Sequence, residues 1–117
     1  MSYKYYFISL KKLKMTKEEE YYHKIASAIS GAEKSQMFGK PCYKINKKAF
    51  CCFFENEMVF KLKFNSELYQ EALSLDGTKL FDPSGKGRAM KEWVQVSFEY
   101  VEFWEKFADS AVEYLKS

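Results

Sequence analysis

Cysteine and histidine are the residue types in this chain that could bind a metal or form a nucleophile–base pair. The sequence has Cys42, Cys51, Cys52 and a single histidine, His23. Adjacent cysteines in a strand point to opposite faces of a sheet, so Cys51 and Cys52 do not converge on one ion as zinc ligands must. His23 falls on the polar face of a predicted helix, which indicates a solvent-facing side chain. We predict buried, reduced thiols, no metal, no cofactor, no catalytic residues and no enzyme activity.

A glycine-rich segment, LFDPSGKGRAMKEWVQV at residues 80–96, is the remaining candidate site. A phosphate-binding loop with the pattern G-x-x-x-x-G-K-[ST] would need glycine at position 80 and Ser or Thr at position 87. The chain has Leu80 and Gly87 there. The residues that follow predict a strand, not a helix whose N-terminus could hold phosphate. The segment is therefore not a P-loop.

A looser anion site at this segment stays a hypothesis. Gly85 and Gly87 allow positive φ, so backbone N–H groups could converge on an anion beside the neighbouring cations. The favoured alternative is a glycine-rich hairpin whose cations keep the sheet edge soluble. The residues of this candidate anion-binding or partner-binding loop are Gly85, Lys86, Gly87, Arg88, Lys91 and Trp93.

Composition and charge limit the class of protein. The chain has 117 residues, 47% apolar and 19% aromatic, which predicts one folded domain and excludes disorder. No apolar run approaches the length that a bilayer requires, and the first residues lack the order of a signal peptide, so we predict a cytoplasmic protein without a membrane partner. Residues 1–15 have four lysines and no acid, whereas the other 102 residues have 15 basic and 16 acidic side chains. We therefore divide the chain into a basic, aromatic arm at 1–15 and a single domain at 16–117.

The first predicted helix begins at a capping box formed by Thr16 and Glu19 and ends at Gly31. Its apolar stripe at helical spacing consists of Tyr22, Ile25, Ala26 and Ile29. We expect this whole stripe to face the core.

Residues 33–64 predict strands joined by tight turns near 39–41, at 46–48 and at 55–57. Residues 49–54, AFCCFF, form the continuous apolar run that is typical of a central strand covered on both faces. Residues 58–64 alternate strictly, and the side chains predicted on one face are Met58, Phe60, Leu62 and Phe64.

The second half predicts a helix that begins after Asn65 or Ser66, two strands around the glycine-rich loop, and a long C-terminal helix capped by Ser97. The element order is α-β-β-β(β)-α-β-β-α. Short turns between neighbouring strands favour antiparallel pairing. The order therefore predicts a two-layer α+β fold in which helices pack against an antiparallel sheet.

These motifs, in this order and at this spacing, resemble the TfoX N-terminal domain family, which belongs with YjbR-like proteins in the secretion-chaperone-like α+β fold. The resemblance covers roughly residues 17–116 and includes GKPCYKINKKAFCCFF, MVFKLKF and the pattern F.P.G.GR.M..W..V. In this chain the pattern falls on Phe81, Pro83, Gly85, Gly87, Arg88, Met90, Trp93 and Val96. Family members tend to begin just before the first helix, so the resemblance marks residues 1–14 as an additional arm or an upstream extension.

Two function classes follow. The resemblance implies a small bacterial-type regulatory domain, because TfoX proteins resemble regulators of competence, and it carries no agreed catalytic residues. We favour a non-enzymatic protein-interaction or regulatory module with an unknown protein partner, and the sequence leaves a homodimer open. The alternative is a nucleic-acid-binding protein, since YjbR-like relatives are sometimes labelled DNA-binding. Its cations at the sheet edge would be Lys40, Lys44, Lys47 and Lys48, together with those of the glycine-rich loop.

Overall fold

The structure, a computed structural model, describes residues 15–117. Its central layer is a six-stranded sheet with the order β1-β2-β3-β4-β6-β5, and every neighbouring pair is antiparallel. The strands are β1 (Glu33–Met37), β2 (Lys40–Ile45), β3 (Lys48–Phe54), β4 (Glu57–Lys61), β5 (Lys79–Phe81) and β6 (Met90–Val96). The predicted arm, apart from Met15, lies outside the described residues.

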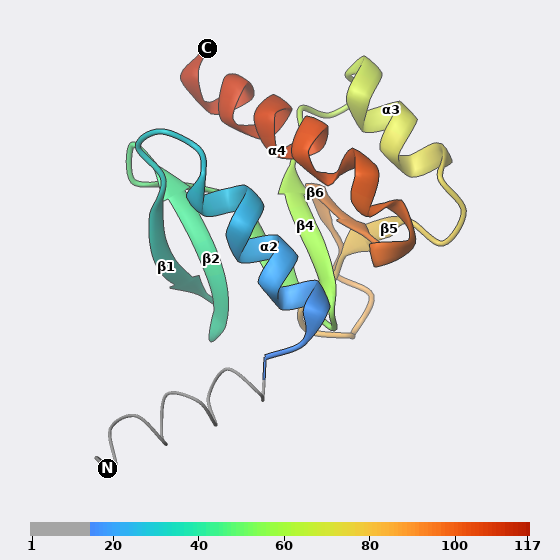
Figure 1. Cartoon of the computed structure of the whole chain (residues 1–117). Helices are drawn as coiled ribbons and strands as arrows, with labels where there is room; N and C mark the ends of the chain where they lie inside the picture. Colours follow the sequence, from blue (N-terminus) through green and yellow to red (C-terminus); the bar gives the residue numbers. More distant parts are fainter. Residues whose placement is uncertain (1–14) are drawn as a thin grey trace, which may run out of the picture.

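Three α-helices form the second layer, and Figure 1 shows α4 lying across the sheet between α2 and α3. The helical elements are α2 (Lys17–Ser27), α3 (Glu67–Ser74), the short 3-10 helix η1 (Phe98–Tyr100) and α4 (Val101–Lys116). The predicted two-layer α+β fold and its element order are confirmed. Within residues 15–117, no helix combines the length and apolarity that crossing a membrane requires.

Tight hairpins explain why the first four strands lie side by side. Each hairpin is closed by two residues with positive φ, a conformation that matches the right-handed twist of paired strands. The residue pairs are Phe38 and Gly39, Asn46 and Lys47, and Glu55 and Asn56. The meander from β1 to β4 is therefore specified by local turns.

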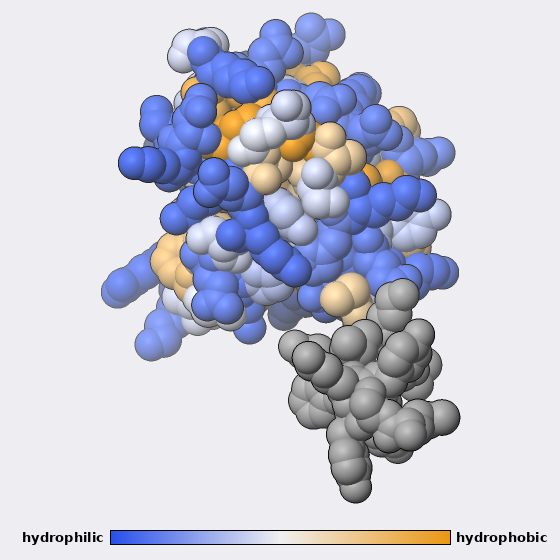
Figure 2. Space-filling model, turned by 60° about the vertical axis from the view of Figure 1, so that its left-hand side comes forward, coloured by the Kyte–Doolittle hydropathy of each residue, from blue (hydrophilic) through white to orange (hydrophobic). Residues whose placement is uncertain are grey.

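Apolar side chains form one cluster on each face of the sheet. The larger cluster lies under the helices and includes Trp104, whose indole N–H donates to the Ser97 carbonyl oxygen over 3.2 Å. The smaller cluster, on the other face, consists of Cys42, Cys52, Val59, Phe81 and Trp93. Cys51 belongs to the larger cluster and Cys52 to the smaller one, so the predicted opposite orientation of these neighbours is confirmed. Figure 2 shows a largely hydrophilic surface on which apolar side chains gather in small areas.

Four predicted element bounds need correction. The first helix, α2, ends at Ser27 with Ala28 as its C-cap, before the predicted end at Gly31. The pairing of β4 with β6 ends at Lys61, so Phe64 lies beyond the strand and its side chain is 48% exposed, with its ring 5.5 Å from Tyr69. Ser97 caps η1, and α4 begins only at Val101. Lys40 already belongs to β2, because the turn lies one residue earlier than the proline suggests.

Candidate functional site

The glycine-rich loop between β5 and β6 is organised by an acid within the loop itself. The Asp82 carboxylate accepts hydrogen bonds from the backbone N–H groups of Gly85, Gly87 and Arg88 over 3.1, 2.8 and 3.2 Å. It also accepts one from the Ser84 hydroxyl over 2.8 Å. The Ser84 hydroxyl and these N–H groups hold the pKa of the Asp82 carboxyl below its ordinary value. The converging N–H groups therefore exist, and their acceptor is Asp82.

Positive φ at both loop glycines permits this arrangement. Gly85 has φ 69° and Gly87 has φ 78°, and these values turn successive N–H groups toward one side of the backbone. Asp82 was not among the sequence-predicted site residues. Its position before Pro-Ser-Gly is the available signal, because aspartate at the start of a turn often accepts from backbone groups that follow.

The six predicted loop residues do not form one site. Lys86 and Arg88 are exposed on the loop. Lys91 belongs to β6 and places its Nζ 5.8 Å from the centre of the Phe64 ring. Trp93 is buried in the smaller apolar cluster, with the Lys61 ammonium 5.5 Å from its ring centre. The loop thus gathers the two glycines and Arg88 around Asp82 and leaves Lys91 and Trp93 elsewhere.

His23 is half-buried rather than solvent-facing, which corrects the sequence prediction. Its Nδ1 lies 2.9 Å from the Tyr43 hydroxyl and its Nε2 lies 3.4 Å from the Glu19 carboxylate. Glu19 therefore contacts His23, while Thr16 still caps α2 by accepting from the Glu19 N–H over 3.1 Å.

Burial raises the pKa of the Cys51 thiol well above its ordinary value, so this neighbour of Tyr43 stays protonated at neutral pH.

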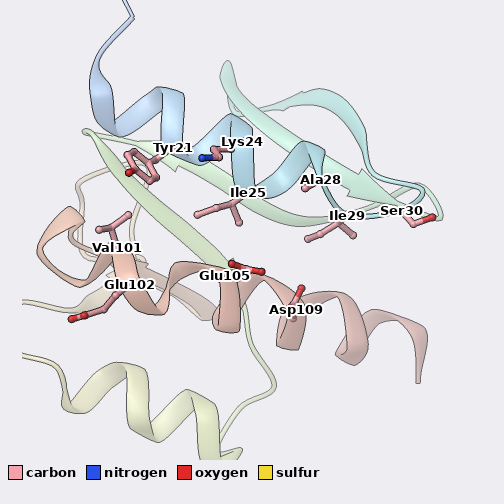
Figure 3. A pocket seen from close by; sticks show the side chains of 10 residues that line it. All are labelled: Tyr21, Lys24, Ile25, Ala28, Ile29, Ser30, Val101, Glu102, Glu105 and Asp109. Carbon is pink, nitrogen blue, oxygen red and sulfur yellow. The ribbon is translucent and has the colours of Figure 1, made fainter.

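A groove of about 540 Å³ between α2 and α4 is lined by more apolar than polar surface. Its floor includes Ile25 and Ile29 of α2 and Val101 of α4, and Figure 3 shows the two isoleucines pointing toward α4. Ile25 and Ile29 are only half-buried, whereas their neighbours Tyr22 and Ala26 are fully buried. The predicted apolar stripe of this helix is therefore divided between the core and the groove.

Acidic side chains line the α4 wall of the groove: Glu102, Glu105 and Asp109. In Figure 3, Glu105 and Asp109 lie on the side of α4 that faces α2. Neither forms an ion pair with any of the described residues. The α2 wall contributes Tyr21 and Lys24, and the Lys24 ammonium lies 5.8 Å from the Tyr21 ring centre. The groove thus combines an apolar floor with an acidic wall.

Sequence reasoning missed this groove. The apolar stripe of the first helix predicts that Ile25 and Ile29 face the core, whereas in the structure both are half-exposed and line the groove. The available signal is that the C-terminal helix has acids at positions 102, 105 and 109, spaced to lie along one side. Which helix lies opposite them is decided by tertiary packing.

Comparison with family models, curated proteins and solved structures found no match to this chain. The resemblance to the TfoX N-terminal domain family therefore stays a prediction. The part of the chain that the structure describes contains no cluster of three or more His, Cys, Asp or Glu side chains arranged to hold a metal ion.

Proposed function

We propose that this protein is a non-enzymatic protein-interaction or regulatory module that holds a basic amphipathic segment of a partner protein in the α2–α4 groove. The observation that supports this most directly is the apolar floor beside an acidic wall without ion pairs among the described residues. An amphipathic segment buries its apolar side in such a groove, and complementary charges select the partner. The resemblance to a family that includes regulators agrees with this role.

A cytoplasmic location is part of the same proposal. All three cysteines are free thiols and all are buried. Reduced cysteines are usual in cytosolic proteins.

The nucleic-acid alternative has less support from the geometry. Phosphate would need the loop N–H groups, and these donate to Asp82. Lys91, the other predicted cation of this segment, lies over an aromatic ring of the protein itself, with its Nζ 5.8 Å from the Phe64 ring centre. Within the loop, what remains is Lys86 and Arg88, too few for a continuous phosphate-binding surface. Of the other predicted cations, Lys40 lies 5.5 Å from the Phe54 ring centre, whereas Lys47 and Lys48 are exposed at the turn between β2 and β3.

A peptide titration tests the proposal. A fluorescent helical peptide of lysine and leucine is titrated into the wild-type protein and into a Glu105→Gln/Asp109→Asn variant. We expect the variant to bind more weakly, by at most about fivefold, since each exposed ion pair contributes on the order of 0.5 kcal/mol. Added salt should weaken wild-type binding and narrow the difference between the two proteins.

Two controls separate the groove from general attraction. A Glu33→Gln/Glu55→Gln variant removes the same charge from exposed positions outside the groove, so its affinity for the peptide should match the wild type. A scrambled peptide of the same composition should bind more weakly. If both variants lose the same affinity for the peptide, the groove is not the binding site. Binding of a single-stranded oligonucleotide that Lys86→Ala/Arg88→Ala abolishes would support the nucleic-acid alternative instead.

A further inference from the structure

Residues 1–14 of this chain have the chemistry that the groove selects. They include four lysines and no acid, and the apolar or aromatic residues among the remaining positions are Met1, Tyr3, Tyr5, Tyr6, Phe7, Ile8, Leu10 and Leu13. Three of the lysines, Lys11, Lys12 and Lys14, are close to the point where the chain enters α2. This segment, which we call the arm, is thus both basic and rich in side chains that an apolar floor can cover.

The arm also joins the fold beside the groove. The chain passes from residue 14 through Met15 and the N-cap Thr16 into α2, and α2 is one wall of the groove. The α2 helix has 11 residues and is about 16 Å long. Fourteen residues span about 21 Å as a helix and at most about 50 Å when extended. The arm can therefore turn back at Met15 and follow the groove from Tyr21 to Ser30 without straining its attachment.

The charge of the groove and the covalent attachment of the arm both favour binding of the arm in the groove. The α4 wall offers Glu102, Glu105 and Asp109, which have no ion-pair partners among residues 15–117. A short covalent connection gives the arm an effective concentration near the groove on the order of millimolar. A weak intrinsic contact would then suffice for a high occupancy.

We propose that the arm is the resident occupant of the α2–α4 groove, so that a partner segment binds only by displacing it. This inference rests on the proposed function, because the arm would regulate the binding of the partner segment in the same groove. The arm, the groove and the partner form a competitive switch in which the arm lowers the apparent affinity for the partner.

A spin-label experiment on the full chain reads the position of the arm directly. The native cysteines are buried, so a nitroxide can be attached selectively at Ser9→Cys. We expect the methyl signals of Ile25 and Ile29 and the amide signal of Glu105 to lose most of their intensity. The same label in a Lys11→Gln/Lys12→Gln/Lys14→Gln arm should leave these signals largely intact. Signals that are unaffected by the label, or equally affected with both arms, would refute the proposal.

A mixed sample distinguishes the arm of the same chain from the arm of a second copy. It contains an isotope-labelled chain without nitroxide and an unlabelled chain with nitroxide. We expect no loss of the Ile25 and Ile29 signals in this sample. Suppose instead that the Ile25 and Ile29 signals are lost in the mixed sample. If they also stay intact at low concentration in a chain that has both the isotope label and the nitroxide, the arms exchange between copies, and docking within one chain is refuted.

The lysine–leucine peptide then tests the competition. If the arm fills the groove about nine-tenths of the time, the Lys11→Gln/Lys12→Gln/Lys14→Gln variant binds the peptide about tenfold more tightly than the wild type. A Lys47→Gln/Lys48→Gln/Lys79→Gln variant, with the same change in charge at exposed positions outside the groove, should show no such gain. If the wild type and the arm variant bind the peptide with equal affinity, the proposal that the arm occupies the groove is refuted, and the proposed function is unaffected. Spin-label loss at the groove without peptide binding to either protein would refute the proposed function and leave the arm contact standing.

Discussion

Phe38 is a residue whose conformation and exposure are both unfavourable for its type. It occupies the first position of the two-residue turn between β1 and β2 with φ 52°, in the left-handed region, and its side chain is 60% exposed. Gly39, with φ 73°, suits the turn, whereas a left-handed conformation costs a residue with a Cβ roughly 1–2 kcal/mol. The contact that offsets this cost is an edge-to-face approach to Phe81, with ring centres 6.4 Å apart.

We predict that Phe38→Asn makes the protein more stable. Asparagine is favoured before glycine in turns of this kind, and the substitution removes an exposed apolar side chain. The free energy of unfolding in urea should rise by about 1 kcal/mol. Phe64→Asn is the control, because Phe64 is also exposed but sits outside a two-residue hairpin turn and packs on Tyr69, so it should give no gain. A loss of stability in Phe38→Asn would mean that the contact with Phe81 outweighs the strain.

At the scale of the elements, the parts of the fold that local chemistry determines were predictable from the sequence. Thr16 and Ser66 cap their helices as expected, and the apolar run at 49–54 is the buried central strand β3. Phe64 was placed wrongly, because an alternating pattern cannot show where a partner strand ends. The groove was not predictable for a related reason. Whether Ile25 and Ile29 are covered depends on how closely α4 approaches α2. The residue pattern of α2 alone cannot predict the distance between the two helices.

The loop between β5 and β6 gives a prediction at this scale. Asp82→Ala removes the acceptor of three backbone N–H groups and of the Ser84 hydroxyl. We expect the amide protons of Gly85, Gly87 and Arg88 to exchange with solvent much faster, while those of the β6 ladder keep their protection. Asp82→Asn, which retains one side-chain oxygen, should have an intermediate effect.

Amide hydrogen exchange followed by NMR measures these changes. Asp76→Ala is a suitable control, since the Asp76 group that takes part in a hydrogen bond is its backbone carbonyl, which accepts from the Tyr100 hydroxyl. Unchanged exchange at the loop in Asp82→Ala would show that the glycines hold the loop conformation without the carboxylate.

At the scale of the whole molecule, acidic side chains have two distinct roles. Those along α4 face solvent and the groove, whereas Glu92 joins separate parts of the fold. The Glu92 carboxylate accepts from the Phe64 backbone N–H over 2.8 Å and from the Tyr114 hydroxyl over 2.9 Å, and it lies 3.4 Å from the Lys61 ammonium. It therefore connects β6, the segment after β4 and the end of α4.

These contacts make stability depend on pH. The Phe64 N–H, followed by the Tyr114 hydroxyl and Lys61, holds the pKa of the Glu92 carboxyl below its ordinary value, and that of Asp82 is also lowered. The unfolded chain then binds more protons than the folded one in the acid range, so stability rises with pH there. The contribution is complete above the ordinary carboxyl range, about pH 4 to 5, and is lost as the pH falls through the lowered values.

We predict that Glu92→Gln reduces the loss of thermal stability on acidification. Glutamine keeps the shape and an acceptor oxygen but does not titrate, so the variant should be less stable than the wild type near pH 7 and closer to it near pH 3. Thermal unfolding followed by circular dichroism from pH 7 to pH 3 measures both quantities. Glu99→Gln is the matched control: Glu99 is exposed and its side chain has no hydrogen-bond partner among the described residues, so its profile should follow the wild type. Parallel profiles for wild type and Glu92→Gln would show that the contacts of Glu92 stabilise its neutral and ionised forms equally, against the direction of its lowered pKa.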